Sequence, residues 1–255
     1  FAQKNFLTLA RNATRDFKQA QKTQSNARWK KAKDSFYTLI NTIDFLLQPH
    51  SLEALNKSQD PLGKRLPAIL PKLSRDNRKY LSEIHLLLKE YEQSIALQES
   101  VIQAYKNIGN TKEATTQMLS LGRIHLHTGK LKKAITTFTR CVQSALPLEL
   151  LSLAGKCLTF LGTAQRRLFL YKQAEQAYHQ ALAVYGETEP KEQIKIKRLL
   201  GLVYESGFSQ YQQAIIYFND ALLLAKQYHA KNQQLTLLLD IARVHRQKGS
   251  YSKAF

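Results

Sequence analysis

The sequence repeats at a fixed interval of 40 residues over its C-terminal part, and few folds accommodate such a pattern. One column of the repeat is aromatic or leucine and holds Tyr91, Leu131, Tyr171, Tyr211 and Tyr251. A second column is small and holds Ser94, Ala134, Ala174, Ala214 and Ala254. Repetition at this period predicts a solenoid, in which each unit buries its apolar face against the next one. Because stacked repeats present an extended surface, we expect a macromolecule-binding protein.

Each unit also carries the pattern of a helical hairpin. Small, aromatic and small positions follow one another on one face of a second helix, the later two columns being Phe138, Tyr178 and Phe218, with Gln98 as the exception, and Val101, Cys141, Ala181 and Ala221. A first helix is marked upstream by the pairs Leu81–Ser82, Leu121–Gly122, Leu161–Gly162, Leu200–Gly201 and Ile241–Ala242. Turn glycines at 129, 207 and 249 separate the two helices. A small residue lets two helices approach closely, while an aromatic ring fills the gap beside it.

This register resembles the tetratricopeptide repeat, whose pattern runs leucine, small residue, tyrosine, then alanine, aromatic and small. One unit carries it as Leu161, Gly162, Ala174, Tyr178 and Ala181. The resemblance implies an all-α, right-handed α-solenoid of stacked hairpins. The usual unit has about 34 residues, so these units look like the long-helix variants of cell-polarity adaptors, kinesin light chains and several bacterial regulators. The units are expected at about 75–113, 114–154, 155–193, 194–233 and, incomplete, 234–255.

The N-terminal part is expected to hold a divergent unit and an insertion. The spacing of Trp29, Ala32, Phe36 and Leu39 matches that of a second helix, which predicts a helical hairpin over residues 1–47. Residues 48–74 contain four of the six prolines, at positions 49, 61, 67 and 71. Because proline disrupts helix interiors, we expect a loop or short irregular helices there, either functional or only a cap for the stack.

Composition agrees with a helical protein. The 255 residues are 44% hydrophobic, with ten glycines and no alternating apolar run that would predict sheets. No apolar stretch reaches the roughly 18 residues of a membrane span, so we expect a soluble chain. Since the sequence begins at Phe1 without Met and stops at Phe255 inside a second helix, we expect it to be part of a longer protein, and a targeting signal in the missing part stays possible.

The two cysteines are predicted to be buried, unpaired thiols with packing roles. Cys141 occupies a small-residue contact position and Cys157 lies in the next first helix. Their spacing does not match a metal site, and unpaired thiols favour the cytoplasm or another reducing compartment.

Charge points to the kind of partner. Lysine and arginine total 38 against 19 acidic residues, which gives a net charge of +19 and suggests an acidic partner. In the family that the repeats resemble, first helices line a concave groove. The groove-facing side of these helices is predicted to carry Lys79, Arg123, His127, Lys156, Arg166, Arg167, Lys195, Arg198, Arg243 and Arg246, opposed by Asp76, Glu83 and Glu205.

The sequence therefore favours a non-enzymatic scaffold or adaptor that binds an acidic, extended peptide or protein segment along an arginine-rich groove. The alternative without a ligand is that these charged side chains only keep an unpacked helix face solvated. Nucleic acid and the acidic tails of tubulin stay open as partners, although Tyr171, Tyr211 and Tyr251 are expected to pack and not to stack on bases. A regulatory domain whose groove is closed by its own N-terminal segment or a neighbouring domain is a further alternative. Binding of a chaperone's C-terminal tail is disfavoured, because that clamp needs an asparagine one residue after the small register residue, where this sequence has Glu83, Arg123, Thr163, Leu202 and Arg243.

An enzyme is the least supported class. His85, His125 and His245 share one register position, where a packing role is expected, and His125 and His127 point to different helix faces. The sequence shows no glycine-rich phosphate loop and no nucleophile elbow. We expect no catalytic residue, cofactor or metal.

Overall fold

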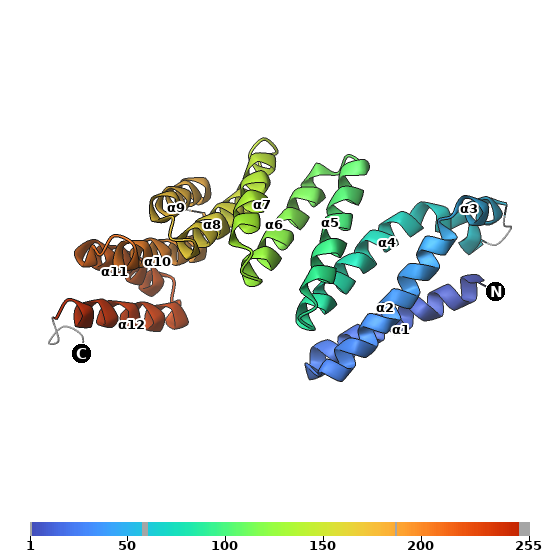
Figure 1. The fold of residues 1–255 in the computed structure, drawn as a ribbon, viewed down its shortest axis with the longest axis horizontal. Helices are drawn as coiled ribbons and strands as arrows, with labels where there is room; N and C mark the ends of the chain where they lie inside the picture. Colours follow the sequence, from blue (N-terminus) through green and yellow to red (C-terminus); the bar gives the residue numbers. More distant parts are fainter. Residues whose placement is uncertain (1, 58–60, 187, 250–255) are drawn as a thin grey trace. The chain divides into compact units, whose positions relative to one another are not determined.

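The computed structural model describes residues 2–57, 61–186 and 188–249. Over these ranges the chain forms twelve α-helices and no strand (Figure 1). The helices are α1 (Ala2–Thr23), α2 (Asn26–Leu46), α3 (Pro49–Asn56), α4 (Pro61–Leu87), α5 (Tyr91–Asn107), α6 (Thr111–His127), α7 (Leu131–Ala145), α8 (Leu151–Arg167), α9 (Tyr171–Tyr185), α10 (Pro190–Ser206), α11 (Tyr211–Gln227) and α12 (Lys231–Gln247). The chain divides between Gln117 and Met118, inside α6, into a first and a second compact unit. Each unit is described by itself below.

The 40-residue period of the sequence reappears in the helices. Alternate helices α5, α7, α9 and α11 begin at Tyr91, Leu131, Tyr171 and Tyr211. Residues with positive φ follow the ends of helices at steps of 20 or 40 residues, half or all of the repeat period: Lys89, Gly109, Gly129, Glu149, Phe169, Ser209, His229 and Gly249. The predicted all-α solenoid of helical hairpins is therefore confirmed. Tyr251 and Ala254 of the two columns lie outside the described residues.

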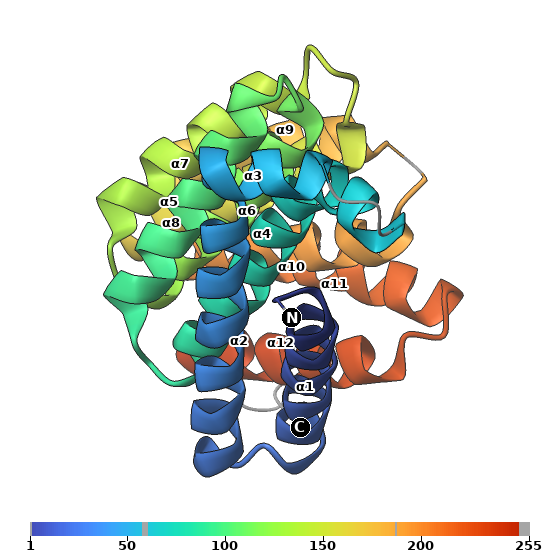
Figure 2. The same ribbon diagram turned by 90° about the vertical axis from the view of Figure 1, so that its right-hand side faces the viewer.

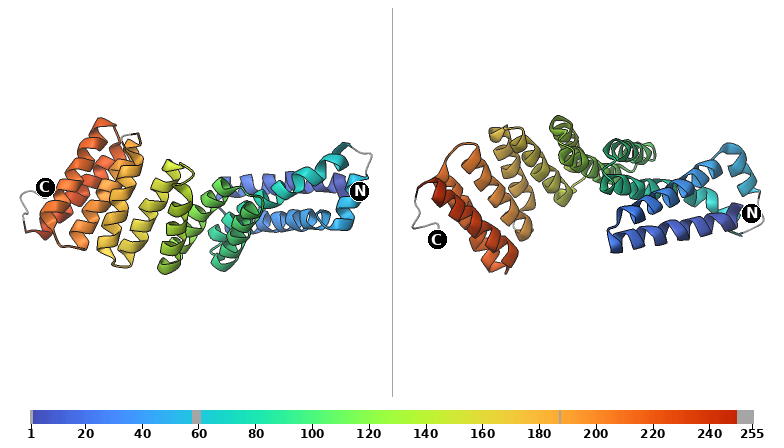
Figure 3. Two further views of the ribbon diagram at one scale, coloured as in Figure 1. Left: turned by 90° about the horizontal axis from the view of Figure 1, so that it is seen from above. Right: turned by 60° about the horizontal axis from the view of Figure 1, so that its bottom comes forward.

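Glycine and an aromatic ring meet at the helix crossings of the second unit, whose stacked helices are visible in Figure 3. A Cβ added to Gly122 would lie 2.4 Å from the ring of Phe138, and one added to Gly201 would lie 2.4 Å from the ring of Phe218. Gly162 and Tyr178 make the same contact at 2.7 Å. All three rings are fully buried. The small first-helix residues were expected at close helix contacts, and the structure adds that each of these three faces a ring for which only glycine leaves room.

The two cysteines form a disulfide between α7 and α8, so the prediction of unpaired thiols was wrong. Cys141 and Cys157 are both fully buried, and their Cα atoms are 6.2 Å apart, within the range that a disulfide spans. The sequence treated the two residues separately, whereas hairpin stacking places the small contact position of α7 against α8. With the thiols paired, the cysteines no longer support a reducing compartment.

The first unit begins with the antiparallel pair α1 and α2, which lie side by side (Figure 2). Trp29, Ala32, Phe36 and Leu39 are buried on α2. The ring of Phe17 on α1 makes edge contacts with Trp29 at 5.6 Å and with Tyr80 of α4 at 5.2 Å. These contacts join α1, α2 and α4 in one apolar core.

Residues 48–74 were expected to form a loop or short irregular helices; α3 is a short helix, whereas residues 61–74 belong to the 27-residue α4, contrary to the expectation. Pro49 and Pro61 are the first residues of α3 and α4, where a missing N–H costs no hydrogen bond. Pro67 and Pro71 lie inside α4, which continues through both. The adjacent Leu66 and Leu70 are fully buried, and this packing offsets the backbone hydrogen bonds that the prolines remove. The sequence rule failed because it weighed proline without tertiary packing.

Among the helices of residues 2–57, 61–186 and 188–249, none has the length and apolar character needed to cross a lipid bilayer. The same residues contain no group of three or more histidine, cysteine, aspartate or glutamate side chains placed to hold a metal ion.

Candidate partner-binding surface

The first helices of the hairpins form one layer in the second unit. Helix α10 packs between α8 and α12, while α9 and α11 pack against α8 and α10 from the other layer. Two groups of side-chain contacts cross this first-helix layer and involve several of the predicted residues. We call its side-chain surface, which carries Arg123, Lys156, Phe160, Lys195, Arg198 and Arg243, the first-helix face.

The first contact is centred on Phe160, a half-buried residue of α8. Its ring stacks on the buried ring of Phe138 with centroids 5.6 Å apart and an angle of 15° between the planes. Two cations from neighbouring helices lie over the ring: Cζ of Arg123 is 5.7 Å and Nζ of Lys195 is 5.4 Å from its centroid. Lys156 lies one turn earlier on α8 and is exposed. We call these four residues the Phe160 patch, which presents an aromatic ring among three cations drawn from α6, α8 and α10.

The second contact is a salt-bridge network between α10 and α12. Arg243 donates two hydrogen bonds to Glu205, at 2.8 and 2.6 Å, and its Nη1 lies 2.9 Å from Asp240. Arg198 also pairs with Asp240. Both carboxylates are buried, and the hydrogen bonds that Arg243 donates to Glu205 raise the pKa of Arg243. Two arginines and two carboxylates cancel in charge here, so this part of the face holds helices together.

Sequence reasoning counted Glu205 against the basic stripe but missed Asp240. Asp240 lies three residues before Arg243 on α12, a spacing at which helical side chains meet. That i,i+3 pair was the signal available in the sequence. Its second partner, Arg198, is 42 residues away and could be found only from the fold.

The remaining predicted residues have different surroundings. Arg167 donates to the backbone carbonyl of Leu126 at 2.7 Å and thereby caps the last turn of α6. Arg166 is half-buried beside Tyr178, and the pKa of that phenol is raised by burial although Arg166 opposes the shift. His127 and Arg246 are exposed in the last turns of α6 and α12.

Lys79 belongs to the first unit and is not joined to the other predicted residues by a described contact. Its ammonium group lies 3.3 Å from Asp76 and 4.7 Å from the centroid of the Tyr105 ring. Burial alone would lower the pKa of Lys79, but hydrogen bonding to Tyr105 and Asp76 outweighs it and raises the pKa. Lys79 therefore bridges α4 and α5.

The packing expected for the tyrosine column is confirmed where the structure describes it. A Cβ added to Gly207 would lie 2.4 Å from the ring of Tyr171, so this ring fills a helix crossing. Tyr211 is partly buried and packs against the core around Phe218. These rings are not open platforms for bases.

A family model for the tetratricopeptide repeat matches residues 118–146, which cover the end of α6 and α7. No curated protein matches the sequence of this chain.

Solved structures of repeat proteins share the fold at low identity. BtubC (BKLC) from P. vanneervenii is 15% identical with a TM-score of 0.56, over 89% of this chain and 92% of its own. A variant of a putative kinesin light chain from Podosopora anserina, with nearly identical TPR-like repeats, is 14% identical with a TM-score of 0.62, over 72% and 90%. The apo form of RapI is 10% identical with a TM-score of 0.64, over 95% and 73%. Residues 118–146 thus match a tetratricopeptide repeat, and the chain has the hairpin-solenoid fold of solved tetratricopeptide-repeat proteins.

Proposed function

We propose that this protein is a non-enzymatic interaction scaffold that binds an acidic, extended peptide or protein segment on the first-helix face of its second unit. The observation that carries the proposal is the Phe160 patch. A half-buried ring with cations on neighbouring helices suits a segment in which an apolar side chain is followed by carboxylates.

The patch has positive charge available for a partner. Arg123 contacts the Phe160 ring and has no carboxylate partner among the described contacts. Besides the Phe160 ring, Lys195 contacts Glu192 at 3.3 Å, its one carboxylate partner among the described contacts. Such i,i+3 surface pairs contribute about 0–1 kcal/mol. A ligand carboxylate can therefore replace this contact at small cost. Of the ten residues predicted for the groove, we assign ligand binding to Arg123, Lys156 and Lys195.

The salt-bridge network next to the patch gives the surface its rigidity. Because Arg198 and Arg243 are already held by buried carboxylates, α10 and α12 are fixed before a partner arrives. A fixed face loses less conformational entropy on binding than a mobile one. In this proposal the two arginines support the surface and do not themselves recognise the ligand.

The proposal is tested by reversing the charge of the patch in the full chain. A peptide array rich in aspartate, glutamate and single apolar residues supplies the probe, and fluorescence anisotropy measures the affinity of the best peptide. The triple variant Arg123→Glu, Lys156→Glu, Lys195→Glu should weaken binding by about tenfold or more, since each exposed ion pair contributes roughly 0.2–1 kcal/mol.

A matched control changes three exposed lysines of the other helix layer, Lys132→Glu, Lys133→Glu and Lys172→Glu. It makes the same change in net charge and should alter the affinity less than twofold. Equal losses in the two triple variants would mean that net charge alone drives binding, which contradicts the proposed site. Phe160→Ala should also weaken binding, because the apolar contact is lost while all cations stay.

A further inference from the structure

Helix α1 of the first unit carries a cationic surface that its own fold does not use. Its buried side consists of Phe6, Ala13, Phe17 and Ala20, which pack into the core with α2 and α4. At about 100° per residue, Arg11, Arg15, Lys18 and Lys22 fall within a sector of roughly 60° on the opposite side. All four are exposed. We call this row the α1 ridge.

The ridge is not neutralised by the only acidic residue of α1. Asp16 is buried, accepts a hydrogen bond from Ser35 at 2.7 Å and lies 3.3 Å from Lys31, so it is directed at α2. Among the described contacts, Asp16 meets the ridge only at Arg15, whose Nε lies 3.7 Å from the Asp16 carboxylate. Arg11, Lys18 and Lys22 have no carboxylate partner among the described contacts.

Without an anion, this arrangement destabilises the helix. Arg11 and Arg15 are four residues apart, as are Lys18 and Lys22, while Arg15 and Lys18 are three apart. Each pair of like charges at these spacings lowers the stability of an exposed helix by about 0.2–0.5 kcal/mol. The first turn of α1 also lacks an acidic residue that would favour the helix dipole. Packing does not require four cations here, because each is on the side away from the core.

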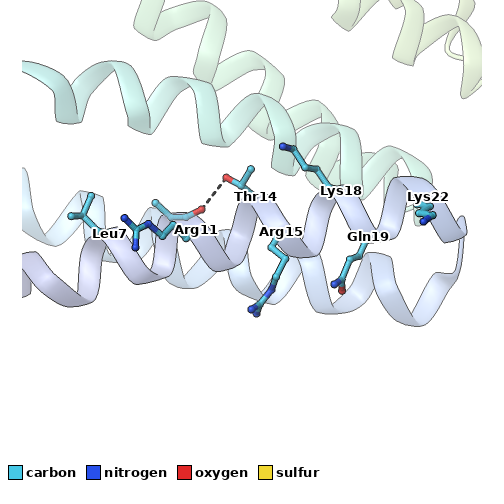
Figure 4. A pocket seen from close by; sticks show the side chains of 8 residues that line it. Leu7, Arg11, Thr14, Arg15, Lys18, Gln19 and Lys22 are labelled. Atoms are coloured by element: carbon cyan, nitrogen blue, oxygen red, sulfur yellow. Dashed lines mark hydrogen bonds between the residues drawn. The ribbon is translucent and has the colours of Figure 1, made fainter.

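An apolar strip runs beside the ridge. Leu7, Ala10 and Thr14 follow one another along the helix, and Leu7 is exposed although apolar. Thr14 satisfies its hydroxyl within the helix by donating to the carbonyl of Ala10 at 2.9 Å, which leaves its methyl group for contact. Strip and ridge together line a shallow cavity of about 630 Å³ (Figure 4). From Leu7 to Lys22 this surface extends about 22 Å at a rise of about 1.5 Å per residue.

We propose that the α1 ridge is a second docking site, separate from the Phe160 patch, for an acidic amphipathic helix. Carboxylates at i, i+4, i+7 and i+11 of such a helix repeat the spacing of the four cations, and a neighbouring apolar stripe covers Leu7, Ala10 and Thr14. The surface is as long as four helical turns, which suits a helix of about 15 residues.

The charges and shape favour this occupant over others. A second copy of the chain is strongly basic, at +19, which disfavours its binding to a row of cations. Nucleic acid binding by stacking needs exposed aromatic rings, whereas Phe6 and Phe17 of α1 are buried. A membrane-surface helix needs a broad free apolar face, and the larger apolar residues of α1 other than Leu7 pack into the core.

The experiment uses the full chain and a labelled 18-residue helical peptide with glutamates at i, i+4, i+7 and i+11 and leucines on the adjacent stripe. A peptide of the same composition with the glutamates spread around the helix serves as the register control. We expect the patterned peptide to bind at least about tenfold more tightly than the scrambled one. The double variant Arg11→Glu, Lys18→Glu should lose that preference, while Lys132→Glu, Lys133→Glu keeps it.

Each remaining outcome counts against the proposal. No binding of the patterned peptide, equal affinity for both peptides, or an equal loss in the two double variants overturns it. The ridge belongs to another class of partner if an RNA of equal charge, or phosphatidylserine vesicles, bind more tightly than the peptide and lose this binding in Arg11→Glu, Lys18→Glu.

Two controls complete the experiment. The neutral variant Arg11→Gln, Lys18→Gln, with its helix content checked by circular dichroism, separates the loss of charge from a loss of structure. Charge reversal in the Phe160 patch should leave this binding unchanged, so the two proposals can fail separately.

Discussion

The helix crossings of the two units are built from different chemistry at the same register positions. In the second unit, glycine faces a buried ring, as in the pair Gly201 and Phe218. In the first unit, Ser82 occupies the glycine position and exchanges reciprocal hydrogen bonds with Ser94, at 2.9 and 2.8 Å. Gln98 takes the place of the ring and donates to Gln117 at 2.8 Å.

The difference shows that the register demands a filled, close contact and not a particular residue type. An apolar crossing is stabilised by burial of the ring, whereas a polar crossing depends on every donor and acceptor being paired.

A second set of polar contacts links the divergent N-terminal hairpin to the first repeat. His85 of α4 contacts Tyr37 of α2 at 2.9 Å and Glu90 at 2.5 Å, and Lys33 of α2 donates to Glu90 at 2.8 Å. His85 was predicted to pack between helices, and it is buried there with hydrogen-bond contacts to two side chains.

The largest expected effect comes from emptying an apolar crossing. Phe218→Ala should lower the free energy of unfolding by about 3–5 kcal/mol, because a fully buried ring is replaced by a cavity. Chemical denaturation followed by circular dichroism measures the loss. Phe169→Ala is the control, since that ring is 76% exposed and should change stability by less than about 0.5 kcal/mol. Similar losses in both variants would show that the buried ring is not special.

Filling the glycine position tests the same crossing from the other side. Gly201→Leu should cost about 2–3 kcal/mol, because the new side chain overlaps the Phe218 ring. Lys191→Leu, at an exposed position of the same helix, should be close to neutral. An unchanged denaturation midpoint in Gly201→Leu would mean that the helices separate at little cost.

A polar crossing should fail through an unpaired group. Gln98→Leu leaves the buried side-chain oxygen of Gln117 without its donor, and we expect a loss of about 1–2 kcal/mol. The double variant Gln98→Leu, Gln117→Leu should recover part of that loss, because neither side then carries an unpaired amide. Additive losses in the double variant would contradict this account of the first unit.

The smallest effect concerns pH and only the first unit. Burial lowers the pKa of His85 below its ordinary value of 6.5, although Glu90 opposes the shift and Lys33 adds to it. The unfolded chain therefore binds the proton more readily, so this part of the stability is present above about pH 6.5 and is lost as the pH falls toward the folded pKa. The pKa of Glu90 is also lowered, chiefly by Lys33, and its contribution is lost only at more acidic pH.

Unfolding free energies of the wild type and of His85→Gln, measured between pH 7.5 and 5.5, check this expectation. The wild type should lose more stability over that window than the variant does. Parallel curves would show that His85 does not titrate differently in the folded and unfolded chains.

Much of the architecture follows from the sequence, because a fixed period averages over many weak local signals. The period predicted that Tyr91 and Tyr171 lie on second helices, and both residues begin such helices in the structure. It also predicted close helix contacts at small residues such as Gly162, whose partner is the ring of Tyr178. Predictions failed where one local rule met tertiary packing, as for the prolines inside α4 and for the pairing of Cys141 with Cys157.

The binding face was harder to predict, because helical position gives the direction of a side chain but not its partner. Arg198 and Arg243 lie on the face that the period indicated, yet each is held by a carboxylate from the neighbouring helix. Phe160 does not belong to a repeated column of the sequence. Its role depends on Arg123 of α6 and Lys195 of α10, which reach it from the helices on either side of α8.

The most direct test of the account is a charge swap at the Phe160 patch. The affinity of the acidic peptide for Arg123→Glu, Lys156→Glu, Lys195→Glu is compared with that of the same peptide carrying lysine in place of glutamate. We predict that the acidic peptide binds the wild type at least about tenfold more tightly than the variant, and that the lysine peptide shows the reverse preference. A variant that binds neither peptide while keeping its helix content, or a wild type that binds both equally, would contradict the assignment of this patch as the recognition surface.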